Sequence, residues 1–353
     1  MTAQISDRED FYQRIGQQHY GALWQVLHGL ITPQPKSPVQ AHRWDYRQAR
    51  EFLMEAGGLI TAQEAERRVL VLENPGMPGE SRITTSLYAG LQLVLPGEIA
   101  PCHRHTQSAL RFVIEGSGAS TSVDGEKTRM EVGDFVITPP WAWHDHGNES
   151  SDPMIWLDGL DVPMVGLFDA SFAEGLSAKR DRLVQDITRN TGDSWARYGA
   201  NMLPVDFEQK KLASPIFNYP YARSREALEM MRQQQEWDPC HGLKMRYINP
   251  VDGLAAMPTI SPFLQLLPKG FRTEVYRSTD ATVFTPVEGQ GKTWVGDTCI
   301  EWQPKDIFVV PSWAPVVHEA SEDAVLFSFS DRIAQQKLGL WREQRGPQQE
   351  SDV

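Results

Sequence analysis

Cysteine, basic residues and long apolar runs are all scarce in this sequence of 353 residues. The three cysteines, Cys102, Cys240 and Cys299, are odd in number and widely spaced, which argues against a disulfide framework and against a cysteine-based metal site. A net charge of −12 argues against nucleic acid or an anionic membrane as a partner. If the substrate is an anion, local cations must attract it against this acidic background.

Targeting and membrane signals are also missing. The first ten residues are polar and acidic, unlike a signal peptide, and no apolar run is long enough to span a bilayer. We therefore expect a protein of the reducing cytoplasm, without a membrane partner. The length of 353 residues suffices for two domains with a substantial core.

The sequence does contain a dense group of histidines. Four of its nine histidines lie within residues 101–148, as the pairs His103/His105 and His144/His146. Side chains two residues apart leave a β-strand on the same face. Two such strands side by side would direct three or four imidazoles at one point, which is how proteins hold a divalent transition metal.

Helical patterns occupy the first part of the chain, residues 1–66. Helices are expected over residues 7–30, 44–56 and 61–68. Gly57 and Gly58 should end the second helix, and Thr61 should cap the third, with Glu64 at the capping-box position. Because this region contains no evident catalytic group, we expect it to pack on a β domain or on a neighbouring subunit.

Alternating apolar residues then predict β-strands. Short strands separated by glycine and proline turns are typical of an antiparallel barrel or jelly roll. We expect an N-terminal barrel with the metal site over residues 67–165, a mixed connector over 166–255, a C-terminal barrel over 256–335, and a C-terminal helix and tail over 336–353. The connector should contain a helix at 224–235, and the terminal helix should lie within 332–345.

The barrel sequence occurs twice. Residues 92–116 align with 265–289 without a gap, and residues 133–146 align with 305–318. The second copy has Tyr276, Ser278 and Val316 where the first has His103, His105 and His144, although His318 remains at the position of His146. Valine cannot bind a metal, and serine binds one poorly. We therefore interpret the first copy as the active barrel and the second as mainly structural, with its metal ligands lost.

Two motifs resemble those of the cupin family. The first, G-x5-H-x-H-x3,4-E-x6-G, is met by Gly97, His103, His105 and Gly116, with Ala109 where the motif has glutamate. The second, G-x5-P-x-G-x2-H-x3-N, is met by Gly133, Pro139, His144 and Asn148, with Trp141 in place of the middle glycine. The resemblance implies a mainly β fold, a double-stranded β-helix (cupin or jelly roll) duplicated as a bicupin, with a helical N-terminal region. The motif spacing selects His144, rather than His146, as the third metal ligand.

A narrower resemblance covers most of the chain. Residues 66–76, 103–116 and 138–148 are similar to the gentisate 1,2-dioxygenase family. This resemblance implies a homotetramer with one Fe(II) per subunit, held in the N-terminal cupin by His103, His105 and His144, and with O2 as co-substrate. The implied reaction cleaves gentisate (2,5-dihydroxybenzoate) between the carbons that carry the carboxyl and ortho-hydroxyl groups, giving maleylpyruvate. Close relatives cleave salicylate or 1-hydroxy-2-naphthoate, so the same chemistry on those substrates is the alternative.

The absence of the motif glutamate has a chemical consequence. Three neutral imidazoles leave an Fe(II) ion its full charge, whereas a carboxylate ligand would reduce that charge. Such a centre suits a substrate that brings two negative oxygens, as the carboxylate and phenolate of gentisate do. The alternatives are another divalent metal, or an empty barrel in a non-catalytic cupin that binds a small aromatic acid.

Three further residues are expected to act beside the metal. Arg111 should face the barrel interior, where a substrate carboxylate or a reacting oxygen anion would be its counter-charge. Its alternative role is a structural ion pair with Glu115 or another acidic residue. His146 should point inward and either bind the substrate and transfer a proton, or be structural. Asp158, on the following strand, should orient His146 or a ligand imidazole.

The remaining candidates concern substrate binding. Gln92 and Tyr88 share one face of the strand before the first motif. The family resemblance implies that both line the substrate pocket, where Tyr88 could bind the second ring hydroxyl. The alternative is that both fill the barrel. Either Arg67 or Arg68 could supply a distal cation for the substrate carboxylate, or lie solvated at a strand edge.

Overall fold

The computed structural model describes residues 2–234 and 236–346, and the chain forms two compact units, one ending at Lys36 and the other beginning at Ser37. The first unit contains helices α1 (Thr2–Gln17) and α2 (Leu23–Leu30). The prediction of one continuous helix over residues 7–30 is therefore wrong. The chain turns between the two helices, where His19 has a φ of +60°.

Residues 37–66, predicted within the N-terminal helical region, belong to the second unit. Strand β1 (His42–Trp44) pairs with β19 (Ile307–Val310), and helix α3 (Tyr46–Leu59) packs on β2 (Val69–Val71) and β3 (Tyr88–Val94). The compact units thus divide at residue 36 and not near 66. Long-range pairing of this kind leaves no trace in a local sequence pattern.

Two local predictions about helix ends have different outcomes. Helix α4 (Ala62–Ala65) begins as predicted, with the Thr61 hydroxyl accepting a hydrogen bond from the Glu64 N–H. Helix α3, however, continues through Gly57 and Gly58. A Cβ at Gly57 would lie 3.1 Å from the Leu93 side chain, so this glycine allows close packing of the helix on β3 and does not end the helix.

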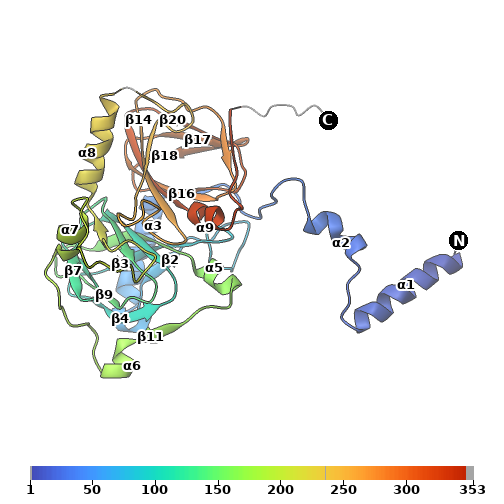
Figure 1. The fold of residues 1–353 in the computed structure, drawn as a ribbon, viewed down its shortest axis with the longest axis horizontal. Coiled ribbons are helices and arrows are strands. Elements are labelled where there is room, and N and C mark those ends of the chain that lie inside the picture. Colours follow the sequence, from blue (N-terminus) through green and yellow to red (C-terminus); the bar gives the residue numbers. More distant parts are fainter. Residues whose placement is uncertain (1, 235, 347–353) are drawn as a thin grey trace. The chain divides into compact units, whose positions relative to one another are not determined.

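The first barrel consists of two antiparallel sheets (Figure 1). Its six-stranded sheet has the order β12-β8-β5-β10-β3-β2, and its five-stranded sheet has the order β11-β4-β9-β6-β7. The strands not yet introduced are β4 (Ile99–His105), β5 (Ala109–Glu115), β6 (Ser120–Val123), β7 (Glu126–Arg129), β8 (Phe135–Thr138), β9 (His144–Gly147), β10 (Met154–Leu160), β11 (Ala173–Gly175) and β12 (Asn218–Tyr219).

The second barrel repeats this plan beside the first (Figure 1, orange and teal). Its sheets have the orders β1-β19-β16-β21-β14-β13 and β18-β17-β20-β15-β22. The new strands are β13 (Leu243–Arg246), β14 (Ser261–Leu267), β15 (Tyr276–Ser278), β16 (Thr282–Glu288), β17 (Gly291–Val295), β18 (Thr298–Trp302), β20 (Val316–Ala320), β21 (Ala324–Ser330) and β22 (Glu343–Arg345).

Backbone geometry repeats between the barrels as the sequence alignment predicts. Gly97 and Gly270 have φ values of +79° and +77°, and Trp141 and Trp313 have φ values of +61° and +62°. Positive φ is rare for a bulky residue, which explains why the cupin motif has glycine at the position of Trp141. The duplicated, mainly β fold is thereby confirmed.

The connector and the C-terminus contain elements that the sequence patterns did not indicate. The predicted connector helix forms as α8 (Tyr221–Arg232), which confirms that prediction, and the same region also forms α5 (Val162–Leu167), α6 (Leu176–Arg180), α7 (Asp193–Tyr198), β11 and β12, which were not predicted. Both strands join sheets of the first barrel. The terminal helix α9 (Arg332–Lys337) is shorter than predicted, because the chain leaves it to form β22, which pairs with β15. The predicted tail from residue 347 onward lies outside the described residues.

The two barrels exchange edge strands. Strand β1 precedes the first barrel but pairs with β19 of the second, whereas β12 precedes the second barrel but pairs with β8 of the first. A buried carboxylate holds the chain directly after each exchanged strand. Asp306 accepts a hydrogen bond from the Tyr46 N–H (3.0 Å), and Asp134 accepts one from the Tyr221 N–H (2.9 Å). Each barrel is therefore completed by a segment of the other repeat.

The core lies mainly between the two six-stranded sheets. Their outer faces form one large apolar cluster, in which the rings of Phe112 and Phe327 stack with centroids 4.0 Å apart. The inner face of the first sheet is apolar only near one end, around Val113, Met154 and Trp156. Further along, that inner face carries the polar residues described below.

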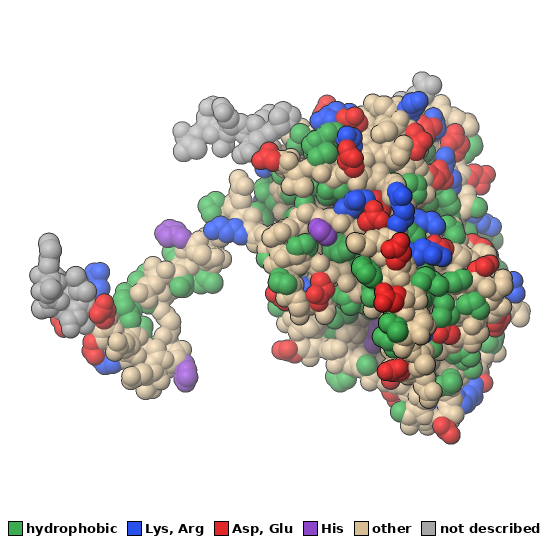
Figure 2. Space-filling model, turned by 180° about the vertical axis from the view of Figure 1, so that it is seen from behind, with side chains coloured by type: hydrophobic (Ala, Val, Ile, Leu, Met, Phe, Trp, Pro, Cys, Tyr) green, Lys and Arg blue, Asp and Glu red, His purple; other side chains and the backbone are tan. Residues whose placement is uncertain are grey.

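The surface carries both signs of charge. On the face shown in Figure 2, acidic and basic side chains are interspersed. No helix within residues 2–234 and 236–346 has both the length and the hydropathy needed to cross a bilayer.

We predict that removing one of the exchange carboxylates destabilises the whole second unit. Asp306 is fully buried and also pairs with Arg43 at 2.7 Å, so Asp306→Ala leaves the buried Tyr46 N–H without an acceptor and removes a partner of the half-buried Arg43. The free energy of unfolding should fall by about 2–4 kcal/mol, measured by urea denaturation. The exposed turn variant Asp297→Ala is the control and should leave the midpoint unchanged. Equal midpoints for both variants would show that the exchange contact contributes nothing.

Candidate metal and substrate site

Three of the four clustered histidines converge at one point inside the first barrel. One ligand atom from each of His103, His105 and His144 lies within 4.8 Å of those of the other two. A one-residue bulge in β4 between Ala100 and His103 sets His103 directly opposite His144 on β9. The ring centroids of that pair lie 4.2 Å apart.

Backbone carbonyl groups fix the orientation of all three imidazoles. Their Nδ1 atoms lie 3.3, 3.0 and 3.0 Å from the carbonyl oxygens of Pro101, Gln107 and Ala142, each two residues away along the chain. A ring proton on Nδ1 of His105 and of His144 leaves Nε2 of each ring free to bind a metal. Nδ1 of His103 faces both the Pro101 carbonyl oxygen and the donating Nη2 of Arg67, so its hydrogen bonds alone do not fix which nitrogen carries the proton. The Nε2 atom of His144 is buried and has no partner within the described chain, as a missing metal ion would leave it.

Electrostatics keep these imidazoles neutral. Burial, followed by the charge of Arg67, lowers the pKa of His103 to about 3, and burial lowers that of His105 to about 4. Burial likewise lowers the pKa of His144 well below its ordinary value. Neutral imidazole is the form that binds a metal, so the donor set fits a divalent transition metal. Among the described residues this is the one cluster with such geometry, and no carboxylate belongs to it.

Of the two arginines left open by the sequence, Arg67 faces the site. Its Nη2 lies 2.7 Å from the Pro101 carbonyl oxygen and 2.5 Å from Nδ1 of His103. Burial, then the charge of Arg111, lowers its pKa to about 10. Arg68 is directed away and donates to both oxygens of Glu98 at 2.9 Å.

Arg111 lies on the inner face, as predicted, next to a buried carboxylate. Its Nη1 donates to the Thr138 hydroxyl at 2.7 Å, and its Nε lies 3.7 Å from Asp158 without a hydrogen-bond partner. Glu115, one partner considered for it, instead binds Arg50 of α3 at 2.8 Å. The pairing between β5 and β10 shifts at the end of β5, where a bulge changes the side on which Glu115 emerges.

Asp158 does not contact an imidazole in this structure, so its predicted role as an orienting group for His146 or a ligand is wrong. It accepts a hydrogen bond from Trp156 Nε1 at 3.0 Å and faces Arg111. Burial raises its pKa to about 6, although Arg111 acts in the opposite direction. Backbone carbonyls, and not this carboxylate, orient the metal ligands.

His146 points into the barrel, as predicted, and is fully buried. Both of its ring nitrogens lack a hydrogen-bond partner within the described residues. Its ring lies 5.7 Å from that of His144 and packs against Trp156 at 5.5 Å. Burial lowers its pKa well below the ordinary value, so the imidazole is neutral. Buried polar groups are rarely left without partners, so His146 is a candidate contact for a bound molecule.

The two predicted pocket residues on β3 differ in their surroundings. The Tyr88 hydroxyl extends over Gly90, where a Cβ atom would lie only 2.9 Å from it. Gly90 is paired across the sheet with Asp158. Burial, then the charge of Asp158, raises the pKa of Tyr88, which is therefore protonated. Gln92 is buried opposite Trp156, nearer the apolar end of the barrel.

Two further groups of residues shape the site and were not predicted. The carbonyls that orient the ligands belong to the main chain and leave no sequence signal. Arg104, between two ligands on β4, lies between the rings of Trp141 and Trp143, at 4.4 and 4.6 Å from their centroids, and pairs with Glu174. This cation–π stack fixes the loop that leads to His144. Because side chains alternate along a strand, the position of Arg104 between the inward-facing His103 and His105 could have indicated a cation on the outer face.

Comparison with known proteins adds independent findings. Residues 90–160 match the cupin domain family. The chain is 69% identical over 343 residues to a gentisate 1,2-dioxygenase of Aquipseudomonas alcaligenes, covering 97% of this chain and 98% of the relative. It is 32% identical over 345 residues to a 5-aminosalicylate 1,2-dioxygenase of a Comamonas species, covering 96% and 90%. The structure resembles that of salicylate 1,2-dioxygenase from Pseudoaminobacter salicylatoxidans in adducts with gentisate, with a TM-score of 0.89, 33% identity, and coverage of 97% and 94%.

We predict that metal retention distinguishes His144 from His146. Alanine at His103, His105 or His144 should reduce bound metal from about one per chain to near zero, because each removes one of three donors. His146→Ala should retain the metal, since His146 lies outside the cluster. Elemental analysis after gel filtration provides the measurement. Loss of metal in His146→Ala with retention in His144→Ala would reverse the assignment.

Proposed function

Because this chain belongs to the gentisate 1,2-dioxygenase family of ring-cleaving cupin enzymes, we propose that it uses one Fe(II) per subunit to cleave gentisate with O2. The bond broken lies between the carbons that carry the carboxyl and ortho-hydroxyl groups, and the product is maleylpyruvate. The observation that carries this proposal is the convergent cluster of His103, His105 and His144. Nδ1 of His105 and Nδ1 of His144 are bound to carbonyls, so that Nε2 of both rings is free.

The donor set suits iron. Imidazole nitrogens bind first-row divalent metals, and three of them leave coordination positions for other molecules. When bound, Fe(II) would supply the centre at which the electron-rich ring transfers electron density to O2. The protein's own contribution is to hold the three imidazoles neutral and fixed in orientation, so that binding requires no rearrangement of the ligands.

Two cations are placed to receive the acidic substrate. Arg67 lies in the bend before β2 and Arg111 on β5, and Nε of Arg111 has no partner within the described chain. A carboxylate or phenolate oxygen would satisfy that donor in a region of low dielectric constant, where the attraction is strong. Asp158 holds Arg111 in place and balances only one of the two positive charges. The site thus favours a ligand with negative oxygens.

Neutral hydrogen-bonding groups complete the pocket. Neither ring nitrogen of His146 has a partner within the described residues. One nitrogen of the neutral ring can accept a proton from the substrate, and the N–H of the other can donate a hydrogen bond. The protonated Tyr88 hydroxyl is suited to bind the second ring hydroxyl of gentisate. Gln92 is buried opposite Trp156 near the apolar end of the barrel, where it would border the ring of the substrate.

We also infer that the protein works as a homotetramer in the cytoplasm. Support comes from α2, in which large apolar side chains are exposed, including Leu23, Trp24 and Leu30 at 55%, 66% and 68%. Apolar surface of this kind is typical of contacts between subunits.

The second candidate is the same reaction on salicylate or 1-hydroxy-2-naphthoate. It is favoured by relatives of this chain that are named for those substrates, at 33% and 30% identity. Both compounds lack a hydroxyl para to the reacting one, so their rings are poorer in electrons. The Tyr88 hydroxyl would then have no phenol partner.

Oxygen uptake tests the function directly. Protein loaded with Fe(II) without air should consume one O2 per gentisate on an oxygen electrode and release a product whose mass equals gentisate plus O2. The His103→Ala variant should show no uptake, because the metal is lost. Oxygen uptake with salicylate or 1-hydroxy-2-naphthoate but not with gentisate would mean that the substrate is wrong and the reaction type is right. No uptake with any of the three would leave a cupin that only binds an aromatic acid.

We predict that Arg111 binds substrate in addition to its structural ion pair. Arg111→Gln should lower kcat/KM for gentisate roughly 30- to 5000-fold, since truncating one partner of a buried charged contact costs about 2–5 kcal/mol. It also leaves Asp158 buried without a counter-charge, which reduces stability.

The double variant Arg111→Gln with Asp158→Asn separates these effects. It removes both charges, so thermal stability should return toward that of the unaltered protein. Activity should remain low if Arg111 contacts the substrate. Recovery of both stability and kcat/KM in the double variant would mean that the arginine is only structural.

A further inference from the structure

The second barrel keeps a cavity at the position that the metal cluster occupies in the first. Tyr276, Ser278 and Val316, which replace the three histidines, line it. Within the described residues no group of metal-binding side chains converges there. The cavity is bordered instead by two cationic side chains, Lys244 of β13 and Arg332 of α9, that have no counterpart among the first barrel's metal ligands.

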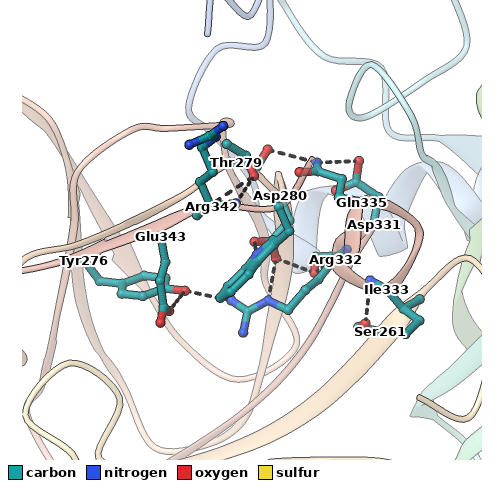
Figure 3. A network of polar contacts seen from close by, with 12 residues as sticks. Ser261, Tyr276, Thr279, Asp280, Asp331, Arg332, Ile333, Gln335, Arg342 and Glu343 are labelled. Atoms are coloured by element: carbon teal, nitrogen blue, oxygen red, sulfur yellow. Dashed lines mark hydrogen bonds and ion pairs between the residues drawn. The ribbon is translucent and has the colours of Figure 1, made fainter. Parts of the chain in front are cut away.

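Arg332 belongs to a buried polar network (Figure 3). Its Nε donates to Asp280 at 3.3 Å, and its Nη2 donates to the Tyr276 hydroxyl oxygen at 2.8 Å. Asp280 also accepts hydrogen bonds from Ser330 at 2.6 Å and from Trp341 at 2.8 Å. Burial alone would raise the pKa of Asp280, but Arg332 and these donors hold it below its ordinary value. The charge of this carboxylate is therefore matched by that of Arg332.

Lys244 brings a second positive charge without a carboxylate of its own. Its Nζ lies 4.9 Å from the ring centroid of Phe263 and 5.6 Å from that of Phe284. In the described part of the chain it forms no ion pair, and the nearby Asp238 is paired with Arg345. Burial, then repulsion from Arg332, lowers the pKa of Lys244 to about 7. When Lys244 is protonated, the buried charges of Lys244, Arg332 and Asp280 leave one positive charge in excess. The other carboxylate near Arg332 is Glu343, which accepts a hydrogen bond from the Tyr276 hydroxyl at 2.9 Å but is exposed to solvent, where its charge is screened.

His318 presents a hydrogen-bond donor to the same space. Trp302 Nε1 donates to the Thr293 hydroxyl oxygen at 2.9 Å, which leaves the hydroxyl proton of Thr293 free for Nδ1 of His318, 2.8 Å away. Burial lowers the pKa of His318 to about 3, so the ring is neutral. With Thr293 donating to Nδ1, the proton of the neutral ring lies on Nε2, and this is the tautomer that the proposal below uses. This tautomer is the reverse of that of the metal ligands, in which Nε2 must be free to accept.

The cavity is small. The volume within which the centre of a water molecule can move is about 20 Å³, close to the minimum that holds one water. The cavity therefore has room for one small ion and too little for an aromatic ring. We propose that the second barrel binds a small monovalent anion, of the size of chloride, nitrate or formate, between Lys244, Arg332 and His318. The anion supplies the missing counter-charge, because a buried cation without a partner is costly. This site does not depend on the reaction of the first barrel.

Bromide provides a direct test, because its anomalous scattering distinguishes it from water. Crystals of the full-length, iron-loaded protein grown in sodium bromide should show an anomalous peak in the second barrel, within hydrogen-bonding distance of Lys244 Nζ. Ordered water alone at that place, with no anomalous peak, would overturn the proposal. This measurement needs no variant.

Thermal unfolding tests the same site in solution. At constant ionic strength, replacing gluconate by chloride, nitrate or formate should raise Tm by about 2–4 °C in a saturable manner. Lys244→Met, which keeps the length of the side chain and removes its charge, should abolish the rise. The matched control Lys269→Met, at an exposed lysine of the same barrel, should preserve it.

Larger acids test the size limit. Any stabilisation by benzoate should persist in Lys244→Met, because benzoate binds only in the first barrel. A benzoate effect that disappears in Lys244→Met would show that the second cavity accepts aromatic acids, and the proposed size class would be wrong. An equal chloride effect in Lys244→Met and the unaltered protein would exclude the site altogether.

Discussion

The packing of the two six-stranded sheets against each other is the interaction on which the rest of the structure depends. Each fully buried side chain in that contact, such as Phe112 or Phe327, contributes roughly 1.5–3 kcal/mol. The interior of the first barrel contains buried polar atoms without partners among the described residues, namely Nε of Arg111 on the opposite face of the first sheet and both ring nitrogens of His146 on β9 of the facing sheet. Each of these costs about 1–3 kcal/mol. The apolar outer face offsets that cost, and one sheet therefore supplies both stability and a reactive interior.

The reciprocal exchange of β1 and β12 explains why a second barrel without metal ligands persists. Because each barrel is completed by a strand of the other repeat, neither is complete alone. Residues that fold the chain are accordingly the same in both copies, as Asp134 and Asp306 illustrate. Residues that bind the metal are free to differ, so Val316 stands where the first barrel has His144. Folding constraints apply to both repeats, whereas the chemistry requires only one.

The family, the duplication and the metal ligands could be predicted because they rest on fixed spacings and strand parity. Both are local properties of the sequence. The partner of Arg111 could not be predicted, since Arg111, Glu115 and Asp158 all have suitable parity and a bulge at the end of β5 redirects Glu115. Edge strands of two or three residues, such as β12, also escaped prediction. Their only signal is a pairing with residues far along the chain.

The local charge inside the first barrel explains how a protein with a negative net charge can bind an anionic substrate. The net charge of −12 is spread over the surface, and salt screens it beyond about 10 Å at 0.1 M ionic strength. Inside the barrel, Arg67 and Arg111 face a single carboxylate, Asp158, which leaves one positive charge in excess before any metal is bound. A divalent metal adds two more. A substrate with a carboxylate and an ionised phenol therefore enters a site that is locally cationic, and the acidic exterior has little influence on its binding.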